Sequence, residues 1–196
     1  MKLNELKNRA YKTACEHGFH EEELSDKHHL MLVITELSEA IEADRKNRFC
    51  SEEVIEMMCM LYPYQQNKTY RKTLVLNDYE MWIKGSVEEE LADAVIRLLD
   101  LAGLRLFNLT VHEVDIDFMS ETYKNEPFTE SIFDICMMPV TAKGLYERRR
   151  STSDVISDMI TAIFGLAKSK NIDLLWHIET KMRYNQNRPN KHGKKY

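Results

Sequence analysis

The chain has 196 residues, 43% of them hydrophobic and 30% charged, which excludes wholesale disorder and fits one globular domain over residues 1–196. Its six glycines and four prolines are too few for a many-turned β architecture and favour long helices with short connections. The formal net charge is −5 and basic residues gather at the C-terminal end, so the acidic body would repel the phosphates of duplex DNA, which argues against a duplex nucleic-acid partner.

The hydrophobic periodicity predicts helices, in chain order, over about residues 2–17, 26–47, 51–62, 86–106, 111–123, 129–138, 154–170 and 173–187. Ser25 caps the second of these helices, and Ser86 with Glu89 forms a capping box at the start of the fourth. Pro139 ends the sixth helix. Between residues 64 and 85 only the DYEMWIKG segment has a helical pattern. No strand pattern occurs, so the predicted fold class is all-α.

The cysteines and the apolar segments indicate the cellular setting. The four cysteines are scattered, without a CxxC pair or a Cys/His cluster at zinc spacing. The N-terminal stretch is too polar for a secretory leader, and no apolar run reaches membrane-spanning length. We therefore expect a cytoplasmic protein with reduced thiols and no membrane partner.

Two pairs of acidic residues interrupt strongly apolar predicted helices. Glu36 and Glu39 form one pair, Glu90 and Asp93 form the other, and the members of each pair are three residues apart. Residues at i and i+3 share a helix face, here one that otherwise carries core residues. A solvated polar face would instead lie opposite the apolar residues. Carboxylates beside a core repel one another and lose hydration, so they need protons, cationic partners or a metal ion.

Two helices that each supply two carboxylates can offer four hard oxygen ligands to a divalent cation. Mg²⁺ prefers such ligands together with phosphate oxygens, and Mn²⁺ can substitute for it. The predicted metal ligands, which are also the predicted catalytic residues, are Glu36, Glu39, Glu90 and Asp93. One of the glutamates, or Glu89, would orient or deprotonate an attacking water, and the sequence does not distinguish between them.

The last part of the chain is basic. Lys181 and Asn185 share a helix face and can contact the phosphate and the sugar or base of a nucleotide, or form an exposed polar stripe. Arg188 and Lys194 belong to a basic tail over residues 188–196, which can clamp phosphates or remain solvated. The predicted substrate-binding residues are Lys181, Asn185, Arg188 and Lys194.

A second helix pair, over about residues 129–188, weakly echoes the metal-binding pair over about residues 24–106. Two of the four acidic positions of the first pair carry an apolar residue in the second, Val155 and Phe133. An old duplication whose second copy lost its metal ligands explains this echo, and so does the general likeness of amphipathic helices.

The ExxE motif at Glu36, followed by the ExxD motif at Glu90, resembles the signature of the MazG-like all-α nucleoside triphosphate pyrophosphohydrolases. The KxxxN pattern that begins at Lys181 is similar to the closing stretch of many members of this family. The matched stretches are residues 24–103 and 156–196, and the departures are the inserts over residues 48–85 and 104–153.

This resemblance implies a helical bundle of the MazG-like type, with additional helices inserted around a core of four. It also implies Mg²⁺-dependent hydrolysis of a (deoxy)nucleoside triphosphate, the expected substrate, to the nucleoside monophosphate and pyrophosphate. Family members commonly build their active sites within or between paired bundles. A homo-oligomer, with a dimer favoured, is therefore expected, and the alternative is that the second helix pair completes the bundle within one chain.

The acidic pairs have two alternative interpretations. A di-iron carboxylate bundle needs Glu-x-x-His motifs on two helices, and this motif does not occur in the chain. A non-catalytic nucleotide-binding protein or helical scaffold remains the alternative, because intact acidic motifs do not prove turnover.

Overall fold

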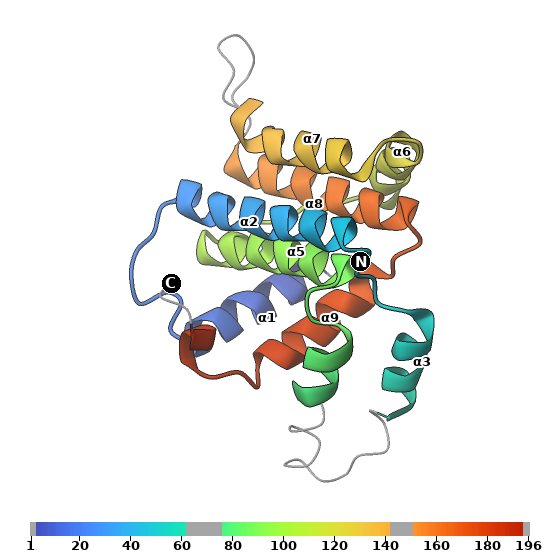
Figure 1. The fold of residues 1–196 in the computed structure, drawn as a ribbon. Coiled ribbons are helices and arrows are strands. Elements are labelled where there is room, and N and C mark those ends of the chain that lie inside the picture. Colours follow the sequence, from blue (N-terminus) through green and yellow to red (C-terminus); the bar gives the residue numbers. More distant parts are fainter. Residues whose placement is uncertain (1–2, 62–75, 142–150, 194–196) are drawn as a thin grey trace.

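The computed structural model describes residues 3–61, 76–141 and 151–193, and over these ranges it is helical, without a strand (Figure 1). The helices are α1 (Leu3–Glu16), α2 (Asp26–Arg45), α3 (Glu52–Leu61), α5 (Val87–Leu104), α6 (Glu113–Tyr123), α7 (Phe128–Thr141), α8 (Thr152–Ser169) and α9 (Leu174–Asn185), followed by the 3₁₀ turn η2 (Asn190–Gly193). A further helical segment covers residues 76–82. The predicted all-α class is confirmed.

Helix α5 lies at the centre of the fold because it is apolar on nearly every side. It packs against α1, α2, α8 and α9, and Figure 1 shows it between α2 and α1. Leu91, Val95 and Leu98 of this helix are fully buried. A helix that is hydrophobic all round is stable only inside the core. The acidic motif at the start of α5 is therefore carried into the interior with it.

The approach of α1 to α5 depends on Gly103. A Cβ atom added at this glycine would lie 2.5 Å from the Cβ atom of Tyr11 on α1. Because real Cβ atoms do not approach so closely, a larger residue at position 103 would push the two helices apart. This contact holds α1 beside the residues that follow the acidic motif of α5.

Helices α6, α7 and α8 form a group on one side of α2 and α5, and α1 and α9 lie on the opposite side (Figure 1). Helix α8 packs against α5, α6 and α7, and α7 also contacts α2. The apolar residues of both groups join in one large core cluster. The helix pair predicted over residues 129–188 corresponds to α7, α8 and α9, and its origin by duplication stays a prediction.

The prediction that a helix ends before Pro139 is wrong, because α7 continues through the proline to Thr141. The proline ring removes one backbone N–H, but it does so in the last turn, where little helix remains to be disturbed. The Thr141 hydroxyl donates to the carbonyl oxygen of Met137 at 3.1 Å. This bond satisfies a carbonyl oxygen near the end of the helix.

The capping box predicted at Ser86 is also wrong in one of its two bonds. The Ser86 hydroxyl accepts a hydrogen bond from the backbone N–H of Glu89 at 3.2 Å, as a cap does. The Glu89 carboxylate does not return the bond to Ser86. It accepts instead from the backbone N–H of Gly85 and from the ammonium of Lys181. A tertiary ion pair has displaced the local contact.

The cysteines and the helices agree with the expectation of free thiols and of no membrane-spanning segment. Cys15, Cys50, Cys59 and Cys136 are free. Within the described ranges, the helices lack the combination of length and apolar character that crossing a bilayer requires.

One buried histidine makes the fold sensitive to acid. The side chain of His177 on α9 is 2% exposed, and its Nδ1 atom has no hydrogen-bond partner among the described residues. Burial lowers the pKa of His177 from 6.5 to about 4, against a smaller opposing effect of Asp173. As the pH falls, His177 is therefore protonated near pH 6.5 in the unfolded chain but only near pH 4 in the folded chain.

Lowering the pH from 6.5 to 4 is expected to remove about 3 kcal/mol of folding stability through His177 alone. Urea unfolding of the parent and of His177→Gln at pH 7, 5.5 and 4 measures this effect. The variant should lose less stability than the parent over the same interval. Parallel losses in the two proteins would contradict the assignment to His177.

Candidate metal centre

Three of the four predicted acidic ligands meet between α2 and α5. Glu36 and Glu39 extend from α2, and Glu90 extends from the first turn of α5. One carboxylate oxygen of each lies within 4.8 Å of the other two. Because α2 and α5 pack side by side, the two i, i+3 motifs bring their carboxylates to a common point. We call Glu36, Glu39 and Glu90 the carboxylate group.

The carboxylate group is buried on one side and open on the other. Glu36 is 4% exposed and Glu90 is 7% exposed, whereas Glu39 is exposed. Burial, and then the charges of Glu89, Asp93, Glu39 and Glu36, raise the pKa of Glu90 to about 9. Without a cation, Glu90 is therefore protonated at neutral pH, and it can ionise once positive charge is supplied.

The geometry of the carboxylate group fits a small divalent cation. Oxygens that surround one Mg²⁺ at about 2.1 Å lie about 3 to 4.2 Å from one another. The separations of up to 4.8 Å between the three carboxylates need only small side-chain rotations to reach that range. The ligands are all hard oxygens, which suits Mg²⁺ or Mn²⁺ and not a metal that prefers thiolates or imidazoles. An exposed Glu39 leaves a side open to solvent and to phosphate.

Asp93, the fourth predicted ligand, lies beside the carboxylate group and is paired with a lysine. Its Oδ2 atom is 2.7 Å from the Nζ atom of Lys181 on α9. Lys181 also donates to the Glu89 carboxylate, and its side chain is 6% exposed. The structure thus connects the predicted metal-binding helix α5 with the predicted substrate-binding helix α9 through one buried ammonium.

The surroundings of Lys181 keep it charged. Its Nζ atom lies 5.5 Å from the ring centres of both Tyr79 and Tyr184, and these two rings stack 4.2 Å apart. Burial alone would lower the pKa of Lys181, but Asp93 and Glu89 outweigh burial and raise this pKa above its ordinary value. The aromatic faces add a cation–π attraction to the two ion pairs. Lys181 is therefore a fixed positive charge inside the protein.

Arg97 is a site residue that the sequence analysis missed. It lies on α5 one turn beyond Asp93, and its Nε atom donates to the carboxylate of Glu36. The i, i+4 spacing from Asp93 is a signal that could have placed Arg97 on the same face as the acidic motif. Its bond to Glu36 across two helices could not be read from that spacing.

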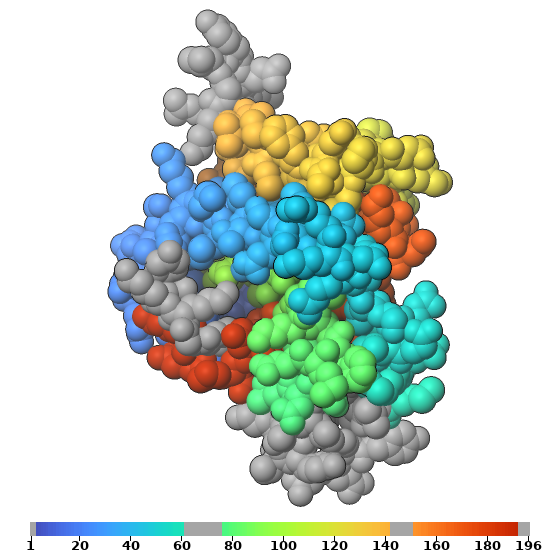
Figure 2. Space-filling model, in the orientation of Figure 1, coloured from blue at the N-terminus to red at the C-terminus, as the bar shows by residue number. Residues whose placement is uncertain are grey.

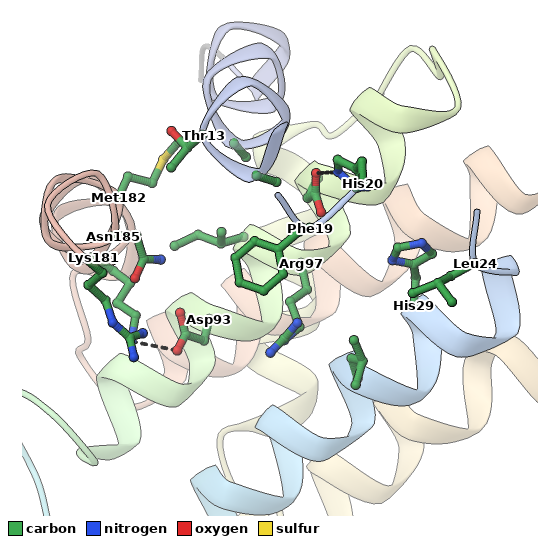
Figure 3. Close-up of a pocket in the computed structure, with 16 residues that line it drawn as sticks. Thr13, Phe19, His20, Leu24, His29, Asp93, Arg97, Lys181, Met182 and Asn185 are labelled. Carbon is green, nitrogen blue, oxygen red and sulfur yellow. Dashed lines mark hydrogen bonds and ion pairs between the residues drawn. The ribbon is translucent and has the colours of Figure 1, made fainter. Parts of the chain in front are cut away.

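A cavity of about 110 Å³ opens between α1, the α1–α2 connection, α2, α5 and α9 (Figure 3), and Arg97, the partner of Glu36, lines it. Figure 2 shows a hollow beneath α2 with α5 at its floor. The residues that line the cavity and bear polar or aromatic side chains include Phe19, His20, His29, Asp93, Arg97, Asp100, Lys181, Asn185 and Arg188.

Two polar atoms of the cavity wall are buried without a hydrogen-bond partner in the described ranges. They are Nε2 of His29 and Oδ1 of Asn185. Burial, the largest effect, lowers the pKa of His29, so this imidazole is neutral at pH 7. His20 lies near it and bonds Asp100 at 2.8 Å. Buried polar groups are normally satisfied, so these two atoms indicate a place for a ligand or water.

The predicted basic tail is only partly described. Arg188 lines the cavity, and its guanidinium lies 5.4 Å from the ring centre of Tyr184. Lys191 pairs with Glu21 at 3.0 Å, and its backbone N–H bonds the carbonyl of His17. The tail therefore lies against the end of α1 as far as Lys191. Lys194 falls outside the described residues, so its predicted contact with substrate stays a prediction.

Comparison with known proteins gives no relative for this chain: no protein-family model matches it, and neither does any curated protein or solved structure. The family expected from the acidic motifs therefore stays a prediction. The residues themselves form a carboxylate group joined through Arg97 to a cavity, which is also lined by the buried Lys181.

Proposed function

We propose that the chain hydrolyses (deoxy)nucleoside triphosphates to nucleoside monophosphate and pyrophosphate, with Mg²⁺ held by the carboxylate group, in a MazG-like helical bundle. The convergence of Glu36, Glu39 and Glu90 from two separate helices is the observation that carries this proposal. Solvated acidic residues have no reason to meet beside a core, because their charges repel. Arg97, the partner of Glu36, lines a cavity that a nucleotide can enter.

The reaction needs positioning and charge stabilisation more than covalent chemistry. A bound divalent cation supplies Lewis-acid polarisation of phosphate oxygens and a more acidic water. The oxygen of water bonds to phosphorus while the bridging oxygen of the α–β anhydride leaves with the electron pair of the broken bond. Glu39, the exposed member of the carboxylate group, stands on the open side and accepts the proton of the water.

The remaining site residues bind and orient the nucleotide. Asn185 offers an unsatisfied Oδ1 atom to an N–H or O–H donor of the base or sugar. Arg188 lies at the cavity wall, where it can reach a phosphate. Lys181 forms ion pairs with Asp93 and Glu89, and its positive charge reduces the net negative charge near the carboxylate group. A dimer, which the family resemblance favours, remains part of the proposal.

A panel of canonical and modified nucleoside triphosphates with Mg²⁺, assayed for monophosphate and pyrophosphate, tests this function. Glu39→Gln is expected to lower the turnover of the best substrate by about 100-fold or more, because it removes a negative ligand and a proton acceptor. Glu42→Gln is the matched control, since Glu42 lies on the same helix and pairs with Arg45 at the surface. Its turnover should stay near that of the parent.

Two results would contradict the proposal. Equal turnover by Glu39→Gln and the parent would remove the site assignment. Binding of nucleotide with Mg²⁺, seen as a rise in melting temperature, without any product from the panel would instead support a non-catalytic nucleotide-binding protein. A helical scaffold would show neither a product nor a rise in melting temperature.

A further inference from the structure

The guanidinium of Arg97 is held at the border between the carboxylate group and the cavity. Its Nε atom donates to Glu36, which belongs to the carboxylate group, and the residue also lines the cavity. Figure 3 shows Asp93 between Lys181 and Arg97, so the two cations stand on opposite sides of one carboxylate. The side chain of Arg97 is 27% exposed, which leaves part of it open to a ligand.

The chemistry of arginine leaves donors for that ligand. A guanidinium has five N–H donors in a rigid fork, and the bond to Glu36 uses the one on Nε. The two terminal nitrogens carry the other four. Nearby, Nε2 of the nine-tenths-buried His29 faces the same cavity without a partner in the described ranges. The cavity wall thus offers both positive charge and an unused hydrogen-bonding atom.

Two other cations, Lys181 on α9 and Arg105 at the end of α5, are already held in ion pairs. Lys181 is buried between Glu89 and Asp93. Arg105, two turns further along α5, bonds Asp26 at 2.7 Å and the carbonyl oxygen of Leu24 at 3.0 Å. Arg97 differs from both because its partner, Glu36, belongs to the carboxylate group. A divalent cation bound to Glu36 would weaken the attraction between Glu36 and Arg97. The positive charge of the guanidinium would then be less neutralised and would attract an anion more strongly.

We propose that Arg97 binds a phosphate oxygen of the substrate, and that its bond to Glu36 holds it ready for this contact. The inference rests on the proposed function for the identity of the substrate. A guanidinium binds phosphate through charge-assisted, often bidentate hydrogen bonds, which a point charge such as an ammonium reproduces only in part. It would also stabilise the negative charge that shifts onto the departing pyrophosphate.

Inorganic tripolyphosphate with Mg²⁺ is the probe, because it carries the phosphates of the substrate without sugar or base. Calorimetric titration of the parent, Arg97→Met and Arg97→Lys measures its affinity. Arg97→Met is expected to weaken tripolyphosphate binding by about tenfold or more, and Arg97→Lys to weaken it less. Arg105→Met is the matched control, since its side chain is 28% exposed, on the same helix, and outside the cavity wall. Its affinity for tripolyphosphate should stay near that of the parent.

Titration with Mg²⁺ alone separates a phosphate contact from a merely structural role. Arg97→Met should bind Mg²⁺ at least as well as the parent, because a competing cation has been removed from Glu36. A loss of Mg²⁺ affinity equal to the loss of tripolyphosphate affinity would overturn the inference, since Arg97 would then act only by shaping Glu36.

The remaining outcomes are also decisive. Unchanged tripolyphosphate binding in Arg97→Met would overturn the inference, and so would a parent protein that does not bind tripolyphosphate. If tripolyphosphate binding is unchanged while nucleotide binding falls, the guanidinium contacts a base edge that presents adjacent acceptors. If tripolyphosphate binding depends on Arg97 but no nucleotide is hydrolysed, the inference stands and the proposed function fails.

Discussion

Replacement of Glu90 by glutamine is expected to abolish hydrolysis and, at the same time, to stabilise the cation-free protein. Burial and the neighbouring acidic residues raise the pKa of Glu90 from 4.5 to about 9. The unfolded chain therefore releases a proton near pH 4.5 that the folded chain keeps until about pH 9, so stability falls as the pH rises between these values. At pH 7 this cost is about 3 kcal/mol, and glutamine removes it.

Turnover should change in the opposite direction, because glutamine cannot supply the negative charge that Mg²⁺ requires. We expect a loss of about 100-fold or more. We also expect Mg²⁺ to raise the melting temperature of the parent but not that of Glu90→Gln. Urea unfolding in a chelator at pH 7 and at pH 4.5 measures the stability term. The gain from Glu90→Gln should be present at pH 7 and nearly absent at pH 4.5, where Glu90 is protonated in the folded chain and half protonated in the unfolded chain.

The surface variant Glu42→Gln is the control for both measurements, and its stability should stay close to that of the parent at either pH. A Glu90→Gln protein that is less stable than the parent in chelator would contradict the assigned environment of Glu90. Full turnover in that protein would contradict its role in the site.

Lys181→Met is expected to destabilise the protein by about 3 to 5 kcal/mol, because it leaves two buried carboxylates without their cation. Glu89 is 2% exposed and the side chain of Asp93 is 19% exposed, so water cannot readily replace the ammonium. Methionine retains the length and apolar character of the lysine stem, so the loss reports on charge more than on packing. Urea unfolding at pH 7 measures it.

Lys168→Met provides a matched comparison at the surface. Lys168 pairs with Asp117, and both side chains are more than half exposed, so its removal should cost far less stability than the removal of Lys181. Removing the charge of a partner as well, in Lys181→Met with Glu89→Gln, should recover part of the lost stability. A Lys181→Met protein as stable as Lys168→Met would show that the buried pair is not what holds α9 against α5.

The parts of the fold that depend on residues close together in the sequence were predictable. Ser25 and Ser86 begin α2 and α5 as expected, because a serine hydroxyl satisfies an N–H of the first helical turn. The all-α class followed from helical periodicity and the scarcity of glycine and proline. The end of α7 was misjudged because a proline in a last turn costs less than one in the middle of a helix.

The candidate site was predictable in part for the same reason. Helical spacing indicated that Glu36 and Glu39 share one helix face and that Glu90 and Asp93 share another. The packing of α2 on α5 brings Glu36, Glu39 and Glu90 together. The contact of Arg97 with Glu36 and that of Lys181 with Asp93 join residues far apart in the chain. Such pairs depend on how the helices dock, which local periodicity does not specify.

The ion pair between Lys181 and Glu89 has a consequence for the order of folding. The two residues are 92 positions apart, and both are buried when paired. During synthesis, α5 emerges long before Lys181 on α9, so Glu89 must stay hydrated until α9 is made. The part of the core around Glu89 therefore stays hydrated in the nascent chain, and it loses this water only when α9 docks against α5.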